Sequence, residues 1–128
     1  MKKFIVLLMV LMVSIVCFGQ ENQQTDSYRP KFKMYQTENI YILLKLDTRT
    51  GQVWQVQYKM RDVVACTVQI YNAYNYSGII REDDGFDGRF ELYPTKNVYT
   101  FILLDTYSGE TYQVQWNIDP EKRFISKL

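Results

Sequence analysis

The side chains in this chain that could do chemistry are amides, phenols and carboxylates rather than the common catalytic groups. The 128-residue sequence contains no histidine and two cysteines. This composition excludes His-based acid/base catalysis, Ser-His and Cys-His nucleophile activation, and His-ligated zinc. The sequence also has no Gly-rich phosphate loop of either common spacing. We therefore expect a protein that is not an enzyme and that uses no cofactor.

Two glutamine pairs are the most unusual polar feature, because they recur at equivalent places in the chain. The pairs are Gln55 with Gln57 and Gln113 with Gln115. In a strand, residues two apart share one face, so each pair could line a polar groove that binds a glycan, a peptide or a partner strand. The alternatives are a solvated sheet face, or amides that pair with each other.

Three tyrosines and an acidic segment lie between the two halves of the chain. Tyr71, Tyr74 and Tyr76 are close together, and loop tyrosines on a rigid scaffold often carry recognition. Asp83, Asp84 and Asp87 could wrap a calcium ion, but their spacing does not follow the EF-hand pattern. A solvated acidic loop is the competing interpretation.

The element that positions these residues is a sequence repeat. Residues 32–57 and 90–115 align without a gap at a shift of 58 residues and are identical at 12 of 26 positions. Each copy predicts a strand, a turn and a return strand. In the turns, Asp47 and Gly51 correspond to Asp105 and Gly109, which is the chemistry of a type I turn closed by a glycine bulge. Backbone bonding explains these aspartates better than a carboxylate-pair hydrolase does.

Alternation within the strands predicts which side chains form the core. The segment from Ile40 to Leu46 is apolar and β-branched, which favours a central strand. In the return strand, alternation predicts that Trp54, Val56 and Tyr58 point inward and that Gln55 and Gln57 point the other way. The same interpretation assigns core or rim positions to Tyr41, Tyr99, Tyr112 and Trp116 and predicts a small, buried Cys66.

These patterns together predict an all-β fold. We expect two tandem antiparallel meanders of three to four strands, related by pseudo-twofold symmetry and packed as a sandwich or a small barrel. One domain should span residues 28–128. Its repeat 1 would cover about 29–70, its connector about 71–88 and its repeat 2 about 89–128.

The repeated phrase, Leu46 to Tyr58 and Leu104 to Trp116, resembles the tandem repeat of small exported Bacteroidetes proteins of unknown function. The resemblance covers most of the chain outside its N-terminus and implies export and a two-copy β architecture. It carries no functional residues over, because the family has no assigned activity. The hairpin phrase also resembles the inner hairpin of a β-propeller blade, from which we take only a blade-like meander.

The N-terminus has the charged, apolar and small-residue order of a secretory signal peptide. Lys2 and Lys3 precede an apolar run that is shorter than a membrane span, and Gly19 is the expected cleavage site. We predict a signal peptide over 1–19 and a disordered leader over 20–27. A membrane anchor and a lipid anchor at Cys17 are the alternatives, and Val16 does not suit the lipid anchor.

Charge and cysteine usage limit the partners and the covalent structure. Cleavage would remove Lys2 and Lys3 and change the formal net charge from +1 to −1, so bulk attraction to nucleic acid or anionic membranes is not expected. It would also leave Cys66 without an intrachain disulfide partner.

We therefore expect a non-catalytic binding module in the periplasm or at the cell surface, with a protein or glycan as ligand. The alternatives are an envelope assembly subunit that pairs through an exposed edge strand, and a small carboxylate-dependent hydrolase.

Overall fold

A computed structural model describes residues 27–58, 65–70 and 78–128. The predicted signal peptide, most of the predicted leader and the tyrosines Tyr71, Tyr74 and Tyr76 lie outside the described residues. Within the described part of the chain, no helix is both long enough and apolar enough to cross a bilayer.

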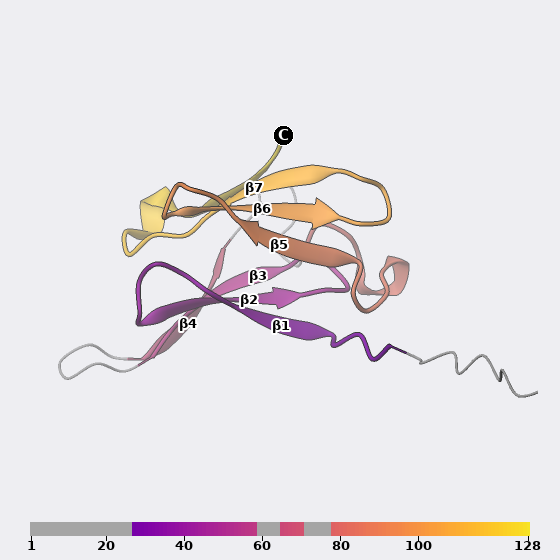
Figure 1. Ribbon diagram of the computed structural model, residues 1–128, viewed down its shortest axis with the longest axis horizontal. Helices are drawn as coiled ribbons and strands as arrows, with labels where there is room; N and C mark the ends of the chain where they lie inside the picture. The colour runs from indigo at the N-terminus through magenta and orange to yellow at the C-terminus, as the bar shows by residue number, and fades with distance from the viewer. Residues whose placement is uncertain (1–26, 59–64, 71–77) are drawn as a thin grey trace, which may run out of the picture.

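The chain folds into two antiparallel four-stranded sheets, each a meander with its strands in sequence order. The first sheet contains β1 (Phe32–Gln36), β2 (Ile42–Asp47), β3 (Val53–Gln57) and β4 (Cys66–Ile70). The second contains β5 (Phe90–Pro94), β6 (Thr100–Asp105), β7 (Thr111–Gln115) and β8 (Phe124–Lys127). Two 3-10 turns, η2 (Glu82–Asp84) and η3 (Pro120–Lys122), precede β5 and β8. The sheets form two layers, with β5, β6 and β7 above β1, β2 and β3 (Figure 1).

The repeat extends through all four strands of each sheet. Phe32 lies opposite Asp47 just as Phe90 lies opposite Asp105. At the other edge, Gln57 pairs with Cys66, as Gln115 pairs with Phe124. Every strand register is therefore the same in both sheets at a shift of 58 residues.

The β2–β3 and β6–β7 turns have the predicted aspartate–glycine chemistry. Asp47 Oδ1 accepts hydrogen bonds from the N–H groups of Arg49 (2.9 Å) and Thr50 (3.4 Å). Gly51 N donates to Asp47 O at 2.9 Å, and its φ of +79° is the left-handed conformation that favours glycine. The second turn repeats this geometry, with Gly109 at φ +78°. The predicted glycine-closed turns are confirmed.

One contiguous core of buried side chains draws on both sheets. The fold is therefore all-β, as predicted, and its two open sheets form a sandwich rather than a closed barrel.

Each repeat has two faces, and the two repeats bury opposite ones. Face A carries Ile42, Leu44, Leu46, Val53 and Gln55 in the first sheet, and Thr100, Ile102, Leu104, Thr111 and Gln113 in the second. Face B carries Leu43, Lys45, Trp54 and Val56 in the first sheet, and Phe101, Leu103, Tyr112 and Val114 in the second. The first sheet buries face A, and the second sheet buries face B.

This arrangement corrects the predicted symmetry. A pseudo-twofold axis between the sheets would bring the same face of each repeat into the core. Here the sheets stack front to back, so the relation between them resembles a translation more than a twofold rotation. The prediction that Trp54, Val56 and Tyr58 point inward is therefore wrong for the first repeat. For the second repeat, the core positions predicted for Tyr112 and Trp116 are confirmed, and Val114 between them is also buried.

The first turn anchors the approach to the second sheet. The Thr48 carbonyl accepts a hydrogen bond from Phe90 N at 2.8 Å, and Thr48 Oγ1 accepts one from Gly88 N at 2.8 Å. The Thr50 carbonyl accepts hydrogen bonds from the N–H groups of Ile79 (2.7 Å) and Ile80 (3.1 Å). Thr48 and Thr50 are buried as a result. The segment from Gly78 to Phe90 thus covers the Asp47–Gly51 turn and fixes the second sheet over the first.

Candidate interaction surface

Front-to-back stacking leaves face B of the first sheet on the outside, and this face is rich in large apolar side chains. We call it the aromatic face; its residues are Phe32, Met34, Leu43, Lys45, Trp54 and Val56. Phe32 and Met34 on β1 are 50% and 52% exposed, although this is the apolar side of their strand. Met34, Lys45 and Trp54 form a cross-strand row over β1, β2 and β3.

The aromatic rings of this face are tilted and covered in part by a cation. The Phe32 and Trp54 ring centroids lie 6.3 Å apart at an interplanar angle of 60°. The Lys45 ammonium lies 4.4 Å from the Trp54 centroid and 5.9 Å from that of Phe32. The cation–π contact holds the long Lys45 side chain across the rings and places a positive charge at the centre of the apolar surface.

An aromatic pair at one end of the aromatic face has a counterpart in the second repeat. The two pairs have the same local structure and differ in their exposure to solvent. Tyr58 donates its hydroxyl to the Ile40 carbonyl and packs on Tyr41, with centroids 5.6 Å apart. In the second repeat, the Trp116 indole donates to the Val98 carbonyl at 3.0 Å and packs on Tyr99 at 5.1 Å. The two clusters match residue for residue, but Trp116 is buried in the core and Tyr58 is 46% exposed.

The four glutamines predicted to form a groove do not share a surface. Gln55 is buried between the sheets at 1% exposure, and its Oε1 accepts a hydrogen bond from Asn117 N at 3.2 Å. Among the described residues, its Nε2 has no hydrogen-bond partner. Gln113 and Gln115 lie on the outer side of the second sheet, where Gln115 Nε2 donates to the Lys122 carbonyl at 3.0 Å. Gln57 is partly buried at the end of β3. The two glutamine pairs therefore do not line one common groove, because the repeats bury opposite faces.

The three aspartates considered as a calcium site each have different surroundings. Asp87 accepts from Arg49 Nε at 2.9 Å, and the Asp84 carbonyl accepts from Arg89 Nη1 at 3.0 Å. Asp83 is exposed on η2. In the part of the chain that the structure describes, no three metal-ligating side chains gather at one point. Cys66, predicted as a small buried residue, is instead an exposed thiol at the start of β4, where the sheet ends.

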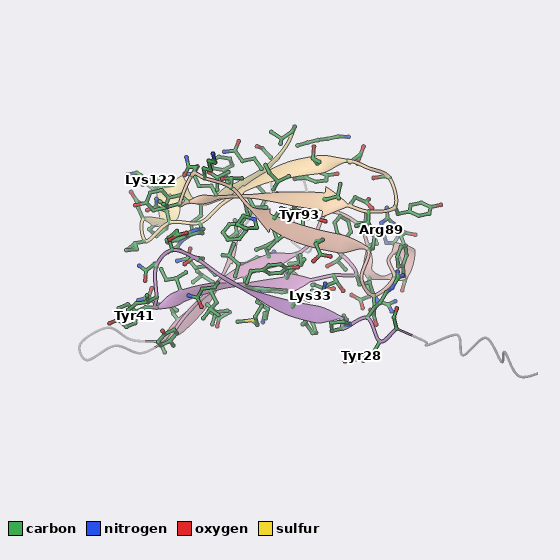
Figure 2. The ribbon with its side chains drawn as sticks, in the orientation of Figure 1. Tyr28, Lys33, Tyr41, Arg89, Tyr93 and Lys122 are labelled. Carbon is green, nitrogen blue, oxygen red and sulfur yellow. The ribbon has the colours of Figure 1, made fainter. Side chains whose placement is uncertain are left out.

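A buried ion pair in the second repeat was not predicted from the sequence. Arg89 Nε and Nη2 donate to the two carboxylate oxygens of Asp105 at 3.0 and 2.8 Å. Burial raises the pKa of Asp105, but hydrogen bonds from Arg89 and Ser108 outweigh it and hold the pKa at about 2. The fork of a guanidinium suits such a bidentate contact, and Lys31 stands at the equivalent place in the first repeat. Figure 2 shows Arg89 at the end of the molecule opposite Tyr41.

Two hollows on the described part of the surface are lined by no residue of the aromatic face. One of about 360 Å³ is lined by residues that include Tyr28, Lys33 and Glu91. The other, of about 490 Å³, lies between β4 and the segment that leads into β8, against Pro120 and Arg123. Neither contains a glutamine of the two pairs. Among the described residues, we take the aromatic face, an open apolar surface, as the candidate site.

Differences in polarity at equivalent positions of the two repeats indicate this face. On face A, Ile42 and Val53 in the first copy are replaced by Thr100 and Thr111 in the second. On face B, Lys45 is replaced by Leu103. Each replacement puts the polar residue on the copy whose face is outside. Aligning the two copies by polarity, rather than by identity, would have identified the aromatic face.

Comparisons with known proteins add no relative to this description, since no family model, curated protein or solved structure was found to match the chain.

Proposed function

We propose that this protein is an exported, non-catalytic interaction module that binds a protein partner through the aromatic face of its first sheet. The observation that carries the proposal is the exposure of Phe32 and Met34 beside Trp54 on a regular four-stranded sheet. Exposed apolar side chains that gather on one face are typical of interaction surfaces, and Trp is among the residues enriched at binding hot spots.

The geometry favours a protein over a glycan as the ligand. Sugar rings stack on flat, open aromatic surfaces, whereas Phe32 and Trp54 are inclined at 60° to each other. Lys45 already occupies the Trp54 ring at 4.4 Å, and a sugar would have to displace it. A protein surface can pack around tilted rings and can also offer an acidic group to the lysine.

Affinity capture from a cell-envelope extract tests the binding function. The bait is the chain, compared with Trp54→Glu on the aromatic face and with Ile118→Glu at an exposed apolar residue elsewhere. We expect wild type and Ile118→Glu to retain the same partner and Trp54→Glu to lose it. Equal recovery by all three baits would show that the aromatic face is not the binding surface.

Export is a separate part of the proposal, supported by the N-terminal charge and apolar pattern of the sequence. Fractionation of cells that express the full chain, with determination of its N-terminus, tests this part. We expect a periplasmic or extracellular protein that begins near Gln20. A cytoplasmic protein with an intact N-terminus would contradict export without bearing on the aromatic face.

A further inference from the structure

We propose that the partner of the aromatic face is a second copy of this chain, bound head to tail. Face B of one copy's first sheet would pack on face A of another copy's second sheet. This inference names the partner for the function proposed above and rests on it.

The interface inside the molecule is the template for this contact. Within one chain, face A of the first sheet packs on face B of the second. The faces left outside are face B of the first sheet and face A of the second. They are the same two kinds of face that already pack together, so stacking a second copy by the same step continues an interface that the fold already makes.

Three cross-sheet contacts show which groups would meet. Lys33 Nζ lies 3.2 Å from Glu91 Oε1, Tyr35 OH accepts from Leu92 N at 3.4 Å, and the Thr48 carbonyl accepts from Phe90 N at 2.8 Å. In a contact between copies, each of these residues is replaced by its counterpart 58 residues away. Lys33, Tyr35 and Thr48 are replaced by Glu91, Tyr93 and Thr106 of one copy. Glu91, Leu92 and Phe90 are replaced by Lys33, Met34 and Phe32 of the next copy.

Each replacement keeps the chemistry of its contact. Glu91 meets Lys33 with the signs exchanged, so lysine and glutamate would alternate along the stack. Tyr93 supplies the same hydroxyl as Tyr35, and it is 48% exposed. The Thr106 carbonyl takes the place of the Thr48 carbonyl. Figure 2 shows Lys33 on the lower sheet and Tyr93 on the upper one.

The second turn is uncovered in a way that matches a missing neighbour. A Cβ at Gly51 would lie 2.8 Å from Ile79 Cγ1, because the segment leading to the second sheet covers the first turn. At Gly109 no heavy atom lies within 4 Å of such a Cβ, and Tyr107 in the same turn is 75% exposed. The corresponding segment of the next copy, residues 20–32, is described from residue 27 on, and residues 27–32 would lie beside this turn. One hydrogen bond is not repeated, because Pro30 stands where Gly88 donates its N–H.

The free faces are more polar than the buried ones, which makes the contact between copies weaker than the contact within a chain. Lys45 stands in place of Leu103, and Thr111 in place of Val53. We therefore infer a reversible, concentration-dependent association. Because the two contacting faces differ, the interface is heterologous, and the rotation between successive sheets decides whether the series closes into a ring or grows as a filament.

Complementation between two variants tests the arrangement, with mass measured by light scattering on the purified full chain. Trp54→Glu blocks the first sheet's free face, and Ile102→Glu blocks the second sheet's free face. We expect the wild type to exceed the mass of one copy as concentration rises and each variant to remain monomeric. An equimolar mixture should form a dimer that does not grow, because each variant retains the face that the other lacks. Tyr93→Phe, which removes one hydroxyl, should weaken wild-type association without abolishing it.

Several outcomes would overturn the proposal. One is a wild type that remains monomeric up to about 1 mM. Another is an Ile102→Glu variant that dimerises alone, which would indicate a symmetric contact between first sheets. A third is a mixture that stays monomeric. Met34→Glu and Thr111→Arg, on the same two faces, replace the first pair if circular dichroism shows that either of those fails to fold.

The same variants separate this inference from the function on which it rests. If the wild type stays monomeric while envelope capture retains a Trp54-dependent partner, self-association is wrong and the interaction module stands. If Trp54→Glu alters neither the mass nor the captured partner, both are wrong.

Discussion

The aspartate that closes the second turn connects backbone geometry to electrostatics at the level of one residue. Asp105 accepts hydrogen bonds from the N–H groups of Tyr107 (3.0 Å) and Ser108 (3.2 Å) and forms an ion pair with Arg89. Its side chain is 2% exposed and that of Arg89 is 12% exposed. The pair is therefore screened weakly by solvent, and losing one partner leaves a largely buried charge.

We predict that Asp105→Asn lowers the free energy of unfolding by on the order of 2 to 3 kcal/mol at pH 7. The folded pKa of Asp105, about 2, lies below its ordinary value of 3.8. Its contribution to stability is therefore present above about pH 4 and is lost as the pH falls toward 2. Urea unfolding at pH 7 and pH 2 should show a difference between variant and wild type that shrinks in acid. The exposed Asp83→Asn is the control, and a difference that does not change with pH would contradict the prediction.

A second residue-scale prediction concerns alkaline pH. Burial, and after it the neighbouring Glu91 carboxylate, raises the pKa of Tyr35 to about 12, and burial also raises that of Tyr112 to about 12. The folded state therefore holds these phenols protonated, and their contribution is lost as the pH rises from 10 to 12. Tyr35→Phe should cost about 1 kcal/mol at neutral pH through its hydrogen bonds, yet lose stability less steeply above pH 10. Thermal melts between pH 8 and 12 measure this, with exposed Tyr28→Phe as the control. Equal slopes in all three proteins would rule it out.

At the scale of elements, the two turns share a backbone but differ in surroundings. Gly51 and Gly109 have nearly the same positive φ, and the aspartate four residues before each one bonds the same N–H groups. A segment covers the first turn and nothing described covers the second. Substitutions at the two glycines therefore separate the cost of conformation from the cost of packing.

We predict that Gly109→Ala costs about 1 to 2 kcal/mol, the penalty of a left-handed conformation for an L-residue. Gly51→Ala should cost more, by about 1 to 3 kcal/mol, because its Cβ would press on Ile79 at 2.8 Å and on the Phe90 ring at 3.1 Å. Urea unfolding of both variants measures the difference directly. Similar costs would mean that the segment from Gly78 to Phe90 does not pack on the first turn.

Most of the elements could be predicted from the sequence, since their causes are local. Alternation places β1, β2 and β3, and the aspartate–glycine spacing places the turns between them. The choice of buried face could not be predicted from alternation, because both faces of the first repeat are apolar: Val53 and Trp54 are neighbours on one strand. Packing between the sheets decides which face is buried. It therefore places Gln55 and Gln113 in different surroundings, although they are equivalent in the alignment of the two copies.

At the scale of the whole molecule, one relation explains where each side chain lies. Two copies of the same meander, stacked front to back, bury Leu44 in the first sheet and leave its counterpart Ile102 partly exposed in the second. Leu103 is buried, whereas its counterpart Lys45 is partly exposed. A twofold relation would bury both members of one pair and expose both members of the other.

This difference gives the most direct test of the architecture, because the two relations predict opposite patterns for four alanine substitutions. Front-to-back stacking predicts that Leu44→Ala and Leu103→Ala each cost about 2 to 5 kcal/mol, since each would leave a cavity between the sheets. Ile102→Ala and Lys45→Ala should each cost about 1 kcal/mol or less, because their side chains reach solvent. Denaturant unfolding below the concentration at which copies associate measures all four, and each substitution serves as the control for its counterpart. If Leu44→Ala and Ile102→Ala lowered the free energy of unfolding equally, the two sheets would be related by twofold symmetry. The reason for a head-to-tail contact would then be lost.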